Sequence, residues 1–235
     1  LNCVANGKLL RHGIFEDIWV QPAAGDSGGA LGAALAAHYM HYKEPRHSKR
    51  PDSMRGSYLG PSVKTSQARQ ELTHLGAHFT ELNEEHLFEF VSKSLAQGHV
   101  VGWFQGQMEY GPRALGARSI LGDARNPHMQ SIMNLKIKFR ESFRPFAPIV
   151  LEEDAAEYFA MDRPSPYMLF VTDIEKRRQV AMTPDQQNLF GIEKLHTPRS
   201  DIPAVTHVDY SARLQTVGAS SHPRLRGLLQ SFKQQ

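Results

Sequence analysis

The spacing of apolar positions predicts a globular unit from about residue 62 onward. Asn83, followed by two glutamates, predicts the start of a helix that Gly98 ends. The apolar positions of this helix share one face: Leu87, Phe88, Val91 and Leu95. Short continuous apolar runs predict buried strands at 99–104, 146–151, 167–174 and 212–217.

Shorter helices are predicted between and after these strands. Asn126 before Pro127 is typical of an N-cap and first helical position, and the helix it opens would bury Met129, Ile132 and Met133. Another short helix is predicted at 152–159, and apolar residues at helical spacing follow Pro223. The mixture predicts the α/β class, of mixed α+β type, with a twisted mixed sheet and helices around it.

The first 61 residues differ from this unit. A turn is predicted at Asn6 and Gly7, a strand at 17–20, and a glycine-rich turn at 22–29 that leads into a small-residue helix ending near Tyr42. Residues 43–61 are basic, contain proline and glycine, and show no periodicity. We interpret them as a linker.

Composition excludes several classes of protein. With 40% hydrophobic and 22% charged residues in 235, the chain can bury a core, so disordered and fibrous classes are excluded. Its longest apolar run, 28–37, is far shorter than the ~18 residues of a membrane-spanning helix. A single cysteine, Cys3, and the lack of a signal-peptide pattern predict a cytoplasmic protein. Leu1 in place of Met, and a last helix without a stop signal before Gln235, predict a fragment.

Positive charge is concentrated in two stretches, although the net charge is only +3. Residues 43–55 hold five Lys or Arg against two acidic residues, and residues 109–144 hold seven against three. Such local concentration favours a compact polyanion, such as a nucleotide, over a long nucleic-acid track.

The string Gly-Asp-Ser-Gly-Gly at 25–29 matches the nucleophile signature of trypsin-like proteases. That chemistry needs an activating histidine and aspartate, well upstream in those enzymes, and only 26 residues precede Ser27. We therefore reject a protease. Two interpretations remain: a phosphate-binding turn at a helix N-terminus, with Asp26 free to bind a metal, or a tight turn before a closely packed helix.

A second motif covers residues 110–119. Gly111 and Gly116 allow close backbone approach, while Arg113 and Arg118 offer planar groups for phosphate or carboxylate oxygens. The string lacks the Gly-Lys-Ser/Thr of a Walker A loop. The alternative is a surface turn with two solvated arginines.

The densest cationic motif covers residues 136–148. Lys136 and Lys138 alternate with Ile137 and Phe139, so in an extended segment the two lysines would project from one face. Together with Arg140 and Arg144 they repel one another unless an anion such as a triphosphate lies between them, and Phe143 or Phe146 could cover an adenine ring. A solvated basic face with buried aromatic residues is the alternative.

The last motif, at 206–213, places a histidine, hydroxyls and an arginine before a strand. A lone histidine such as His207 is more often a structural hydrogen-bonding group than a catalytic one. No group of Cys and His has the spacing of a zinc site.

Three strings, at 101–121, 133–151 and 202–217, closely resemble the C-terminal region of the ATP-dependent O-carbamoyltransferases that modify nodulation factors and antibiotics. In that family a Kae1-like domain of the actin-like ATPase fold precedes a YrdC-like domain. The resemblance implies that residues 1–42 close the Kae1-like domain, 43–61 link the two, and 62–235 form a YrdC-like domain truncated at its C-terminus.

The resemblance also implies a two-step activity. The YrdC-like half would convert carbamoyl phosphate and ATP into carbamoyl adenylate, and the Kae1-like half would pass the carbamoyl group to a hydroxyl of a sugar, antibiotic or nodulation factor. Lys138 and Arg140 match a Lys-x-Arg signature and, with His207, are the catalytic candidates. The other candidates for binding ATP or carbamoyl adenylate are Lys136, Arg144, Ser211 and Arg213, and those for carbamoyl phosphate are Gly111, Arg113, Arg118 and Ser119.

By the same resemblance Asp26 is a metal ligand whose histidine partners would precede Leu1, in a site for a divalent metal such as Fe²⁺, and Mg²⁺ would accompany ATP. The expected partners are these small molecules, not a membrane or a nucleic acid. Gln107 and Tyr210 stand where arginine and glycine are common in the family. The alternatives are a threonylcarbamoyl-adenylate synthase for tRNA modification, a non-catalytic nucleotide-binding module, and RNA binding through the basic linker.

Overall fold

The computed structural model describes residues 2–47 and 52–235, so Leu1 and two cations of the predicted linker, Lys49 and Arg50, lie outside the described residues. The elements of the first half are α1 Cys3–His12, α2 Asp26–Ala36, η1 Ala37–His41, η2 Arg55–Ser57, α3 Thr65–His74, α4 Glu84–Ala96, β1 Val101–Phe104 and β2 Arg118–Leu121. Those of the second half are α5 Met129–Ile132, η3 Met133–Ile137, β3 Ile149–Leu151, η4 Glu152–Asp154, α6 Ala155–Tyr158, β4 Val171–Asp173, η5 Lys176–Arg178, α7 Pro184–Asn188, α8 Gly191–Leu195, η6 Pro203–Val205, β5 Ser211–Arg213, β6 Gln215–Val217 and α9 Pro223–Phe232.

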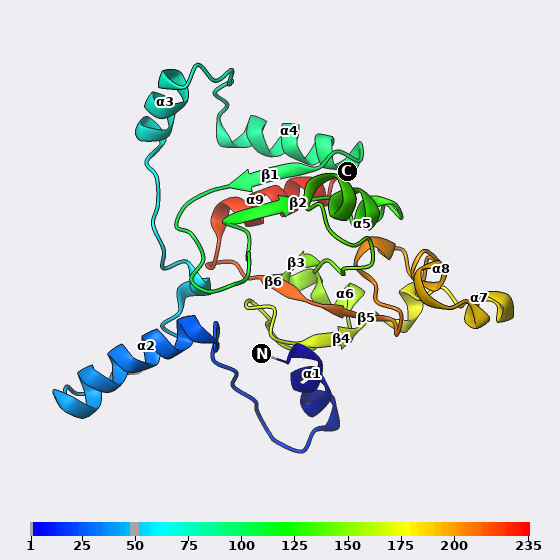
Figure 1. The fold of residues 1–235 in the computed structure, drawn as a ribbon, viewed down its shortest axis with the longest axis horizontal. Helices are drawn as coiled ribbons and strands as arrows, with labels where there is room; N and C mark the ends of the chain where they lie inside the picture. Colours follow the sequence, from blue (N-terminus) through cyan, green and yellow to red (C-terminus); the bar gives the residue numbers. More distant parts are fainter. Residues whose placement is uncertain (1, 48–51) are drawn as a thin grey trace.

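The predicted mixture of helices and strands is confirmed, but the strands of the described residues form three two-stranded sheets and not one continuous sheet. β1 and β2 are antiparallel, β3 and β6 are parallel, and β4 and β5 are antiparallel. Figure 1 shows the three pairs one below another, between α4 at the top and α1 at the bottom. The predicted strand at 212–217 is divided at the fully buried Leu214, so β5 and β6 pair with different partners.

The main core lies between β4, β5 and the segments that follow β3. Phe159, Ile174 and Leu214 are its most buried large residues. The predicted strand at 17–20 is wrong, because this segment is irregular, yet its Ile18 and Val20 pack against the same core.

Helix α1 lies across the edge strand β4. Its Asn6 Nδ2 donates to the carbonyl of Leu169 (3.0 Å), and Arg11 Nη1 donates to that of Val171 (3.2 Å). A Cβ on Gly7 would lie 2.0 Å from the carbonyl oxygen of Val171, so only glycine permits this approach. The prediction of a turn at Asn6 and Gly7 is therefore wrong: the glycine lies inside a helix and serves tertiary packing.

A second core forms where α4 packs against α9. Val91 and Leu95 contact Leu225 and Leu228 in one buried cluster, which also includes Trp103. Each fully buried leucine contributes about 2 kcal/mol of hydrophobic free energy. Asn83 caps α4 by accepting a hydrogen bond from the backbone of His86 (2.9 Å). Both predicted helices are confirmed.

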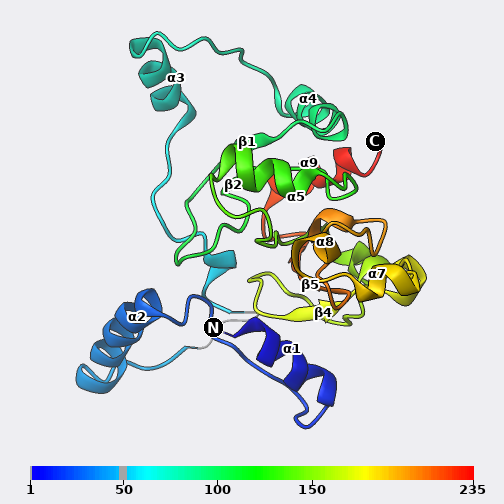
Figure 2. The ribbon, with the colours of Figure 1, turned by 45° about the vertical axis from the view of Figure 1, so that its right-hand side comes forward.

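Helices α2 and α3 project from this body. Figures 1 and 2 show α2 projecting from the sheets at the lower left and α3 at the upper left. The predicted small-residue helix is confirmed as α2, which continues into the π-helical turn η1. The later part of the predicted linker packs into the body, where Met54 and Ser57 are buried and Asp52 accepts a hydrogen bond from Tyr167 (2.9 Å). Among residues 2–47 and 52–235, no helix is both long and apolar enough to cross a membrane.

Candidate functional site

A cavity of about 90 Å³ lies where the glycine-rich turn before α2 meets the 110–119 loop and β5. Its lining includes Arg113, Arg213, Tyr110, Tyr167, Ser57 and Gly25. The structure therefore brings together one arginine from each of two separate sequence motifs. The cavity is small, and its size suits a compact anion better than a whole nucleotide.

The two arginines repel each other in this cavity. Burial, together with the positive charge of Arg113, lowers the pKa of Arg213. Arg213 Nε donates to the carbonyl of Met168 (2.6 Å), and within the described part of the chain neither arginine forms an ion pair with a carboxylate. Two uncompensated guanidinium groups around one cavity favour an anionic ligand with several oxygens.

The 110–119 loop reaches the cavity because two of its positions are glycine. Gly111 has φ 103°, and a Cβ there would lie 2.5 Å from the Cβ of Ala23. Gly116 has φ 106°, and a Cβ there would lie 2.2 Å from Leu225. The hydroxyl of Tyr110 donates to the carbonyl of Ser27, which joins this loop to α2. Gly111 thus serves the backbone approach and does not itself line the cavity.

Glu109, a residue that the sequence patterns did not single out, holds this loop in place. Its buried carboxylate accepts hydrogen bonds through Oε1 from the backbone N–H groups of Leu115 (2.7 Å), Ala117 (2.7 Å) and Arg118 (3.2 Å). An ionised acceptor makes such bonds stronger than neutral ones. In the sequence, the signal that could have identified Glu109 is its position as an acidic residue directly before a glycine-rich, cationic loop.

Arg118 and Ser119, the other candidates for binding carbamoyl phosphate, do not line the cavity. The guanidinium of Arg118 donates to the carbonyls of Gln105 (2.7 Å), Ala117 (2.9 Å) and Gly106 (3.1 Å), and it stacks on Phe104 at 3.5 Å. Ser119 Oγ accepts a hydrogen bond from the backbone of Gly116 (3.0 Å). Both side chains therefore bind backbone groups of the protein and do not face the cavity.

The two lysines of the densest cationic motif do not lie in an extended segment, the arrangement considered from the sequence, because the helix that begins at Met129 continues through η3 to Ile137. Lys136 lies in η3, a π-helical turn that continues α5, and Lys138 directly follows it. Helical spacing prevails because Met129 and Met133 bury one side of this helix against Ala204. The helix itself begins at Met129, after a turn in which Asn126 Oδ1 accepts from the backbone of His128 (2.9 Å).

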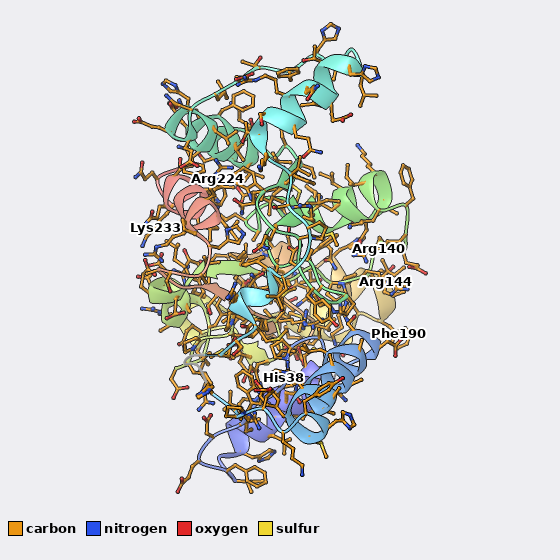
Figure 3. All side chains as sticks on the ribbon, turned by 90° about the vertical axis from the view of Figure 1, so that its left-hand side faces the viewer. His38, Arg140, Arg144, Phe190, Arg224 and Lys233 are labelled. Carbon is orange, nitrogen blue, oxygen red and sulfur yellow. The ribbon has the colours of Figure 1, made fainter. Side chains whose placement is uncertain are left out.

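Four cations still gather around this helix end. Lys136 and Lys138 are exposed and make no ion pair within the residues described, whereas Arg144 pairs with Glu141 (3.1 Å). Arg140 Nε donates to Asn134 Oδ1 (2.7 Å), and its guanidinium lies 5.1 Å from the ring of Phe146. Figure 3 shows Arg140 and Arg144 on one side of the molecule, opposite Arg224 and Lys233.

Phe146 also lines a second, larger cavity, which measures about 460 Å³ and is surrounded mainly by apolar residues of β2, β3, α5 and α9. Its volume falls within the range of small-molecule pockets. Phe143 and Phe146 were the two aromatic residues considered for an adenine ring. Phe146 lines this cavity, whereas Phe143 is half exposed and does not line it.

His207 and Ser211 form a hydrogen-bonded group with Asp209. Ser211 Oγ donates to Asp209 Oδ1 (2.6 Å) and lies 3.0 Å from His207 Nδ1. Burial lowers the pKa of His207, whose Nε2 is buried without a partner among the described residues. Burial acts to raise the pKa of Asp209, but hydrogen bonds from Ser211 outweigh it and hold that pKa below its usual value.

This group is built on a strained turn. Tyr210 has φ 64°, a left-handed conformation in which bulky side chains are rare. The buried Arg199 supports the turn, because its Nε donates to the carbonyl of His207 (3.0 Å). Ser211 and Arg213 alternate with Ala212 along β5 and therefore project from the same face of that strand.

Asp26 is the first residue of α2 and is exposed. In the part of the chain that the structure describes, no three His, Cys, Asp or Glu side chains gather closely enough to hold a metal ion. Asp26 thus supplies a single carboxylate, and these residues alone do not make a metal site. Its role as a metal ligand stays a prediction.

Comparisons with known proteins match the two ends of this chain to two family models. Residues 92–235 match the family model described as carbamoyltransferase C-terminus, and residues 1–35 match the carbamoyltransferase N-terminus. The chain is 55% identical to the uncharacterized protein sll1178 of Synechocystis, over 99% of this chain and 38% of that protein.

Two further relatives carry functional names. The chain is 39% identical to nodulation protein NolO of Bradyrhizobium diazoefficiens (99% of this chain, 39% of that protein) and 32% identical to 3'-hydroxymethylcephem-O-carbamoyltransferase of Streptomyces clavuligerus (100% and 38%). The chain spans less than two fifths of the length of these relatives. The match to the C-terminal model covers more than half of the chain, which therefore belongs to the carbamoyltransferase family of enzymes.

Proposed function

We propose that this chain forms the part of an O-carbamoyltransferase that activates carbamoyl phosphate with ATP. The observation that carries the proposal is the cavity in which Arg113 and Arg213 meet without a carboxylate partner among the described residues. Such a cavity fits carbamoyl phosphate, or the carbamate derived from it, because two planar guanidinium groups can each bind two oxygens.

The proposed step forms a bond between a carbamate oxygen and the α-phosphorus of ATP, and pyrophosphate leaves. Carbamate arises when water attacks the phosphorus of carbamoyl phosphate and the P–O bond to the carbamate oxygen breaks, which yields carbamate and orthophosphate. Phosphoryl transfer of this kind depends mainly on positioning and on neutralising the charge that develops on the phosphate oxygens. Mg²⁺ would enter with ATP and help to neutralise the charge of its phosphates, with few ligands from the protein.

In this proposal the cations near Arg140 bind the ATP phosphates, while Phe146 stacks on the adenine ring. Lys136 and Lys138 are free to turn toward a triphosphate, because neither forms an ion pair in the described chain. Arg140 is already held by its hydrogen bond and needs no reorganisation to act. His207 and Ser211 line neither cavity, and they would help to position the carbamoyl adenylate by holding each other and the start of β5.

The wider assignment is also part of the proposal. Residues from about 62 onward would be the YrdC-like, adenylate-forming domain, and residues 1–42 would belong to the Kae1-like domain that transfers the carbamoyl group to a hydroxyl acceptor. The name of the cephem relative gives a hydroxymethyl group as one such acceptor. Asp26 would then contribute one ligand to the metal of the Kae1-like site.

The test is ATP–pyrophosphate exchange by this chain, with and without carbamoyl phosphate. We expect exchange that requires carbamoyl phosphate and is lost in Arg140→Ala. The matched control is Arg69→Ala, since Arg69 forms an exposed ion pair with Glu81 (2.5 Å) on α3 and should leave exchange unchanged. Bound ATP without carbamoyl-phosphate-dependent exchange, in folded protein, would contradict the proposal and favour a non-catalytic nucleotide-binding module.

A further inference from the structure

Asn134 is a buried amide at the second position of η3, with no exposed surface. Its side chain makes three hydrogen bonds, all to the segment that follows the helix. Nδ2 donates to the carbonyls of Ser142 (3.0 Å) and Arg144 (2.8 Å), and Oδ1 accepts from Nε of Arg140 (2.7 Å). The reversed amide would place oxygen against two carbonyls, so this orientation is the one the surroundings permit.

These bonds fix a turn with an unfavourable backbone conformation. The backbone N–H of Arg140 donates to the carbonyl of Asn134 (3.1 Å), and that of Lys138 donates to Met133 (2.9 Å). Phe139 between them has φ 47° and an exposed fraction of 85%. A bulky residue in the left-handed region is strained and persists only where its surroundings hold it.

We infer that Asn134 is a positioning residue that holds the turn from Lys138 to Arg140 in the geometry required to bind the phosphates of ATP. The inference rests on the proposed function. Asn134 itself would not touch the phosphates, because its amide groups are occupied within the protein. Without the amide, Arg140 and the strained turn would be free to adopt other conformations. A displacement of about 1 Å in a binding group can reduce the reaction rate about 100-fold.

The experiment compares Asn134→Ala and Asn134→Asp with Gln130→Ala as the matched control. Gln130 Nε2 donates to the same carbonyl of Arg144 (3.2 Å), but its side chain makes no hydrogen bond to Arg140. The Asp variant can still accept from Arg140 but cannot donate to the two carbonyls, so it separates the two functions of the amide. Each full chain is measured by ATP–pyrophosphate exchange and by limited trypsin cleavage after Lys136, Lys138 and Arg140.

We expect Asn134→Ala to raise the KM for ATP at least about tenfold. The KM for carbamoyl phosphate should not change, because Arg113 and Arg213 lie at a different cavity. Trypsin should cleave the turn faster in both Asn134 variants and at the wild-type rate in Gln130→Ala. A merely unstable protein would instead lose kcat with both KM values unchanged. If the Ala variant does not fold, the same measurements on the Asp variant test the inference.

Two results would overturn the inference: cleavage of the Asn134 variants at the wild-type rate, or faster cleavage with an unchanged KM for ATP. If the wild-type chain shows no exchange, the proposed function fails first. The inference is then tested by whether Mg-ATP protects the turn from cleavage by trypsin. Protection in the wild type that is lost in Asn134→Ala supports it, and no protection in the wild type overturns it.

Discussion

At the scale of single residues, two side chains that the motifs did not single out hold the cationic loops in place. Glu109 and Asn134 are both buried, and both bind mainly backbone groups of a cationic loop. Arg113 and Arg140 were predicted as anion-binding residues from the chemistry of arginine, and Arg213 was predicted from the family resemblance. A buried acid or amide that holds a loop leaves no periodicity or charge pattern, so sequence patterns alone could not reveal it.

Two buried histidines predict how stability depends on pH. Burial lowers the pKa of both His207 and His222 in the folded chain, so the unfolded chain binds protons more readily. Their contribution to stability is complete above the unfolded pKa of about 6.5 and is lost as the pH falls through it toward the folded values. The free energy of unfolding should therefore decrease between pH 7.5 and 5.5.

The measurement is urea unfolding at several pH values across this window. His207→Gln and His222→Gln should each reduce the slope of stability against pH, because glutamine does not titrate. His128→Gln serves as the control, since His128 is exposed. A slope that is the same in both buried-site variants as in the wild type would show that these two histidines do not carry the dependence.

At the scale of elements, the sequence predicted best those segments whose periodicity and caps agree. α4 and α9 were predicted closely because their apolar faces pack on each other and Asn83 and Pro223 mark their starts. Tertiary contacts explain the predictions of local structure that were wrong. α1 contains Gly7, where a turn was predicted, because its backbone lies on β4, and the segment at 17–20 is irregular although its Ile18 and Val20 pack on the main core.

The contact between α1 and β4 can be tested with one methyl group. In Gly7→Ala the added Cβ would lie 2.0 Å from the carbonyl oxygen of Val171, and backbone on both sides leaves no flexible side chain to move. We expect a loss of about 1–3 kcal/mol in the free energy of unfolding and faster amide exchange in β4.

Gly32→Ala is the matched control for this substitution. Gly32 lies inside α2, where a Cβ would meet nothing within 4 Å, so alanine should strengthen the helix by up to about 1 kcal/mol. Equal stability of Gly7→Ala and the wild type would mean that α1 is not docked on β4 in solution.

At the scale of the whole molecule, the candidate anion cavity joins segments that are far apart in the chain. Gly25 comes from the region that matches the N-terminal family model, and Arg113 and Arg213 come from the region that matches the C-terminal one. Each motif could be recognised by itself. Their meeting could not be predicted, because it depends on β5 pairing with β4 and on Gly111 lying against Ala23.

This arrangement predicts that an anion stabilises the fold through both arginines at once. The like charges of the two arginines oppose each other when no anion is bound, so Arg113→Gln should leave the stability of the free protein unchanged or slightly higher. Carbamoyl phosphate, or orthophosphate as a simpler probe, should raise the Tm of the wild type, since a ligand at 100 times its Kd adds about 2.7 kcal/mol to the free energy of unfolding. Arg113→Gln should lose most of that rise, whereas Arg69→Gln should keep it. An equal rise in Arg113→Gln and the wild type would place the anion elsewhere, and the cavity would then be a packing defect between the two family regions.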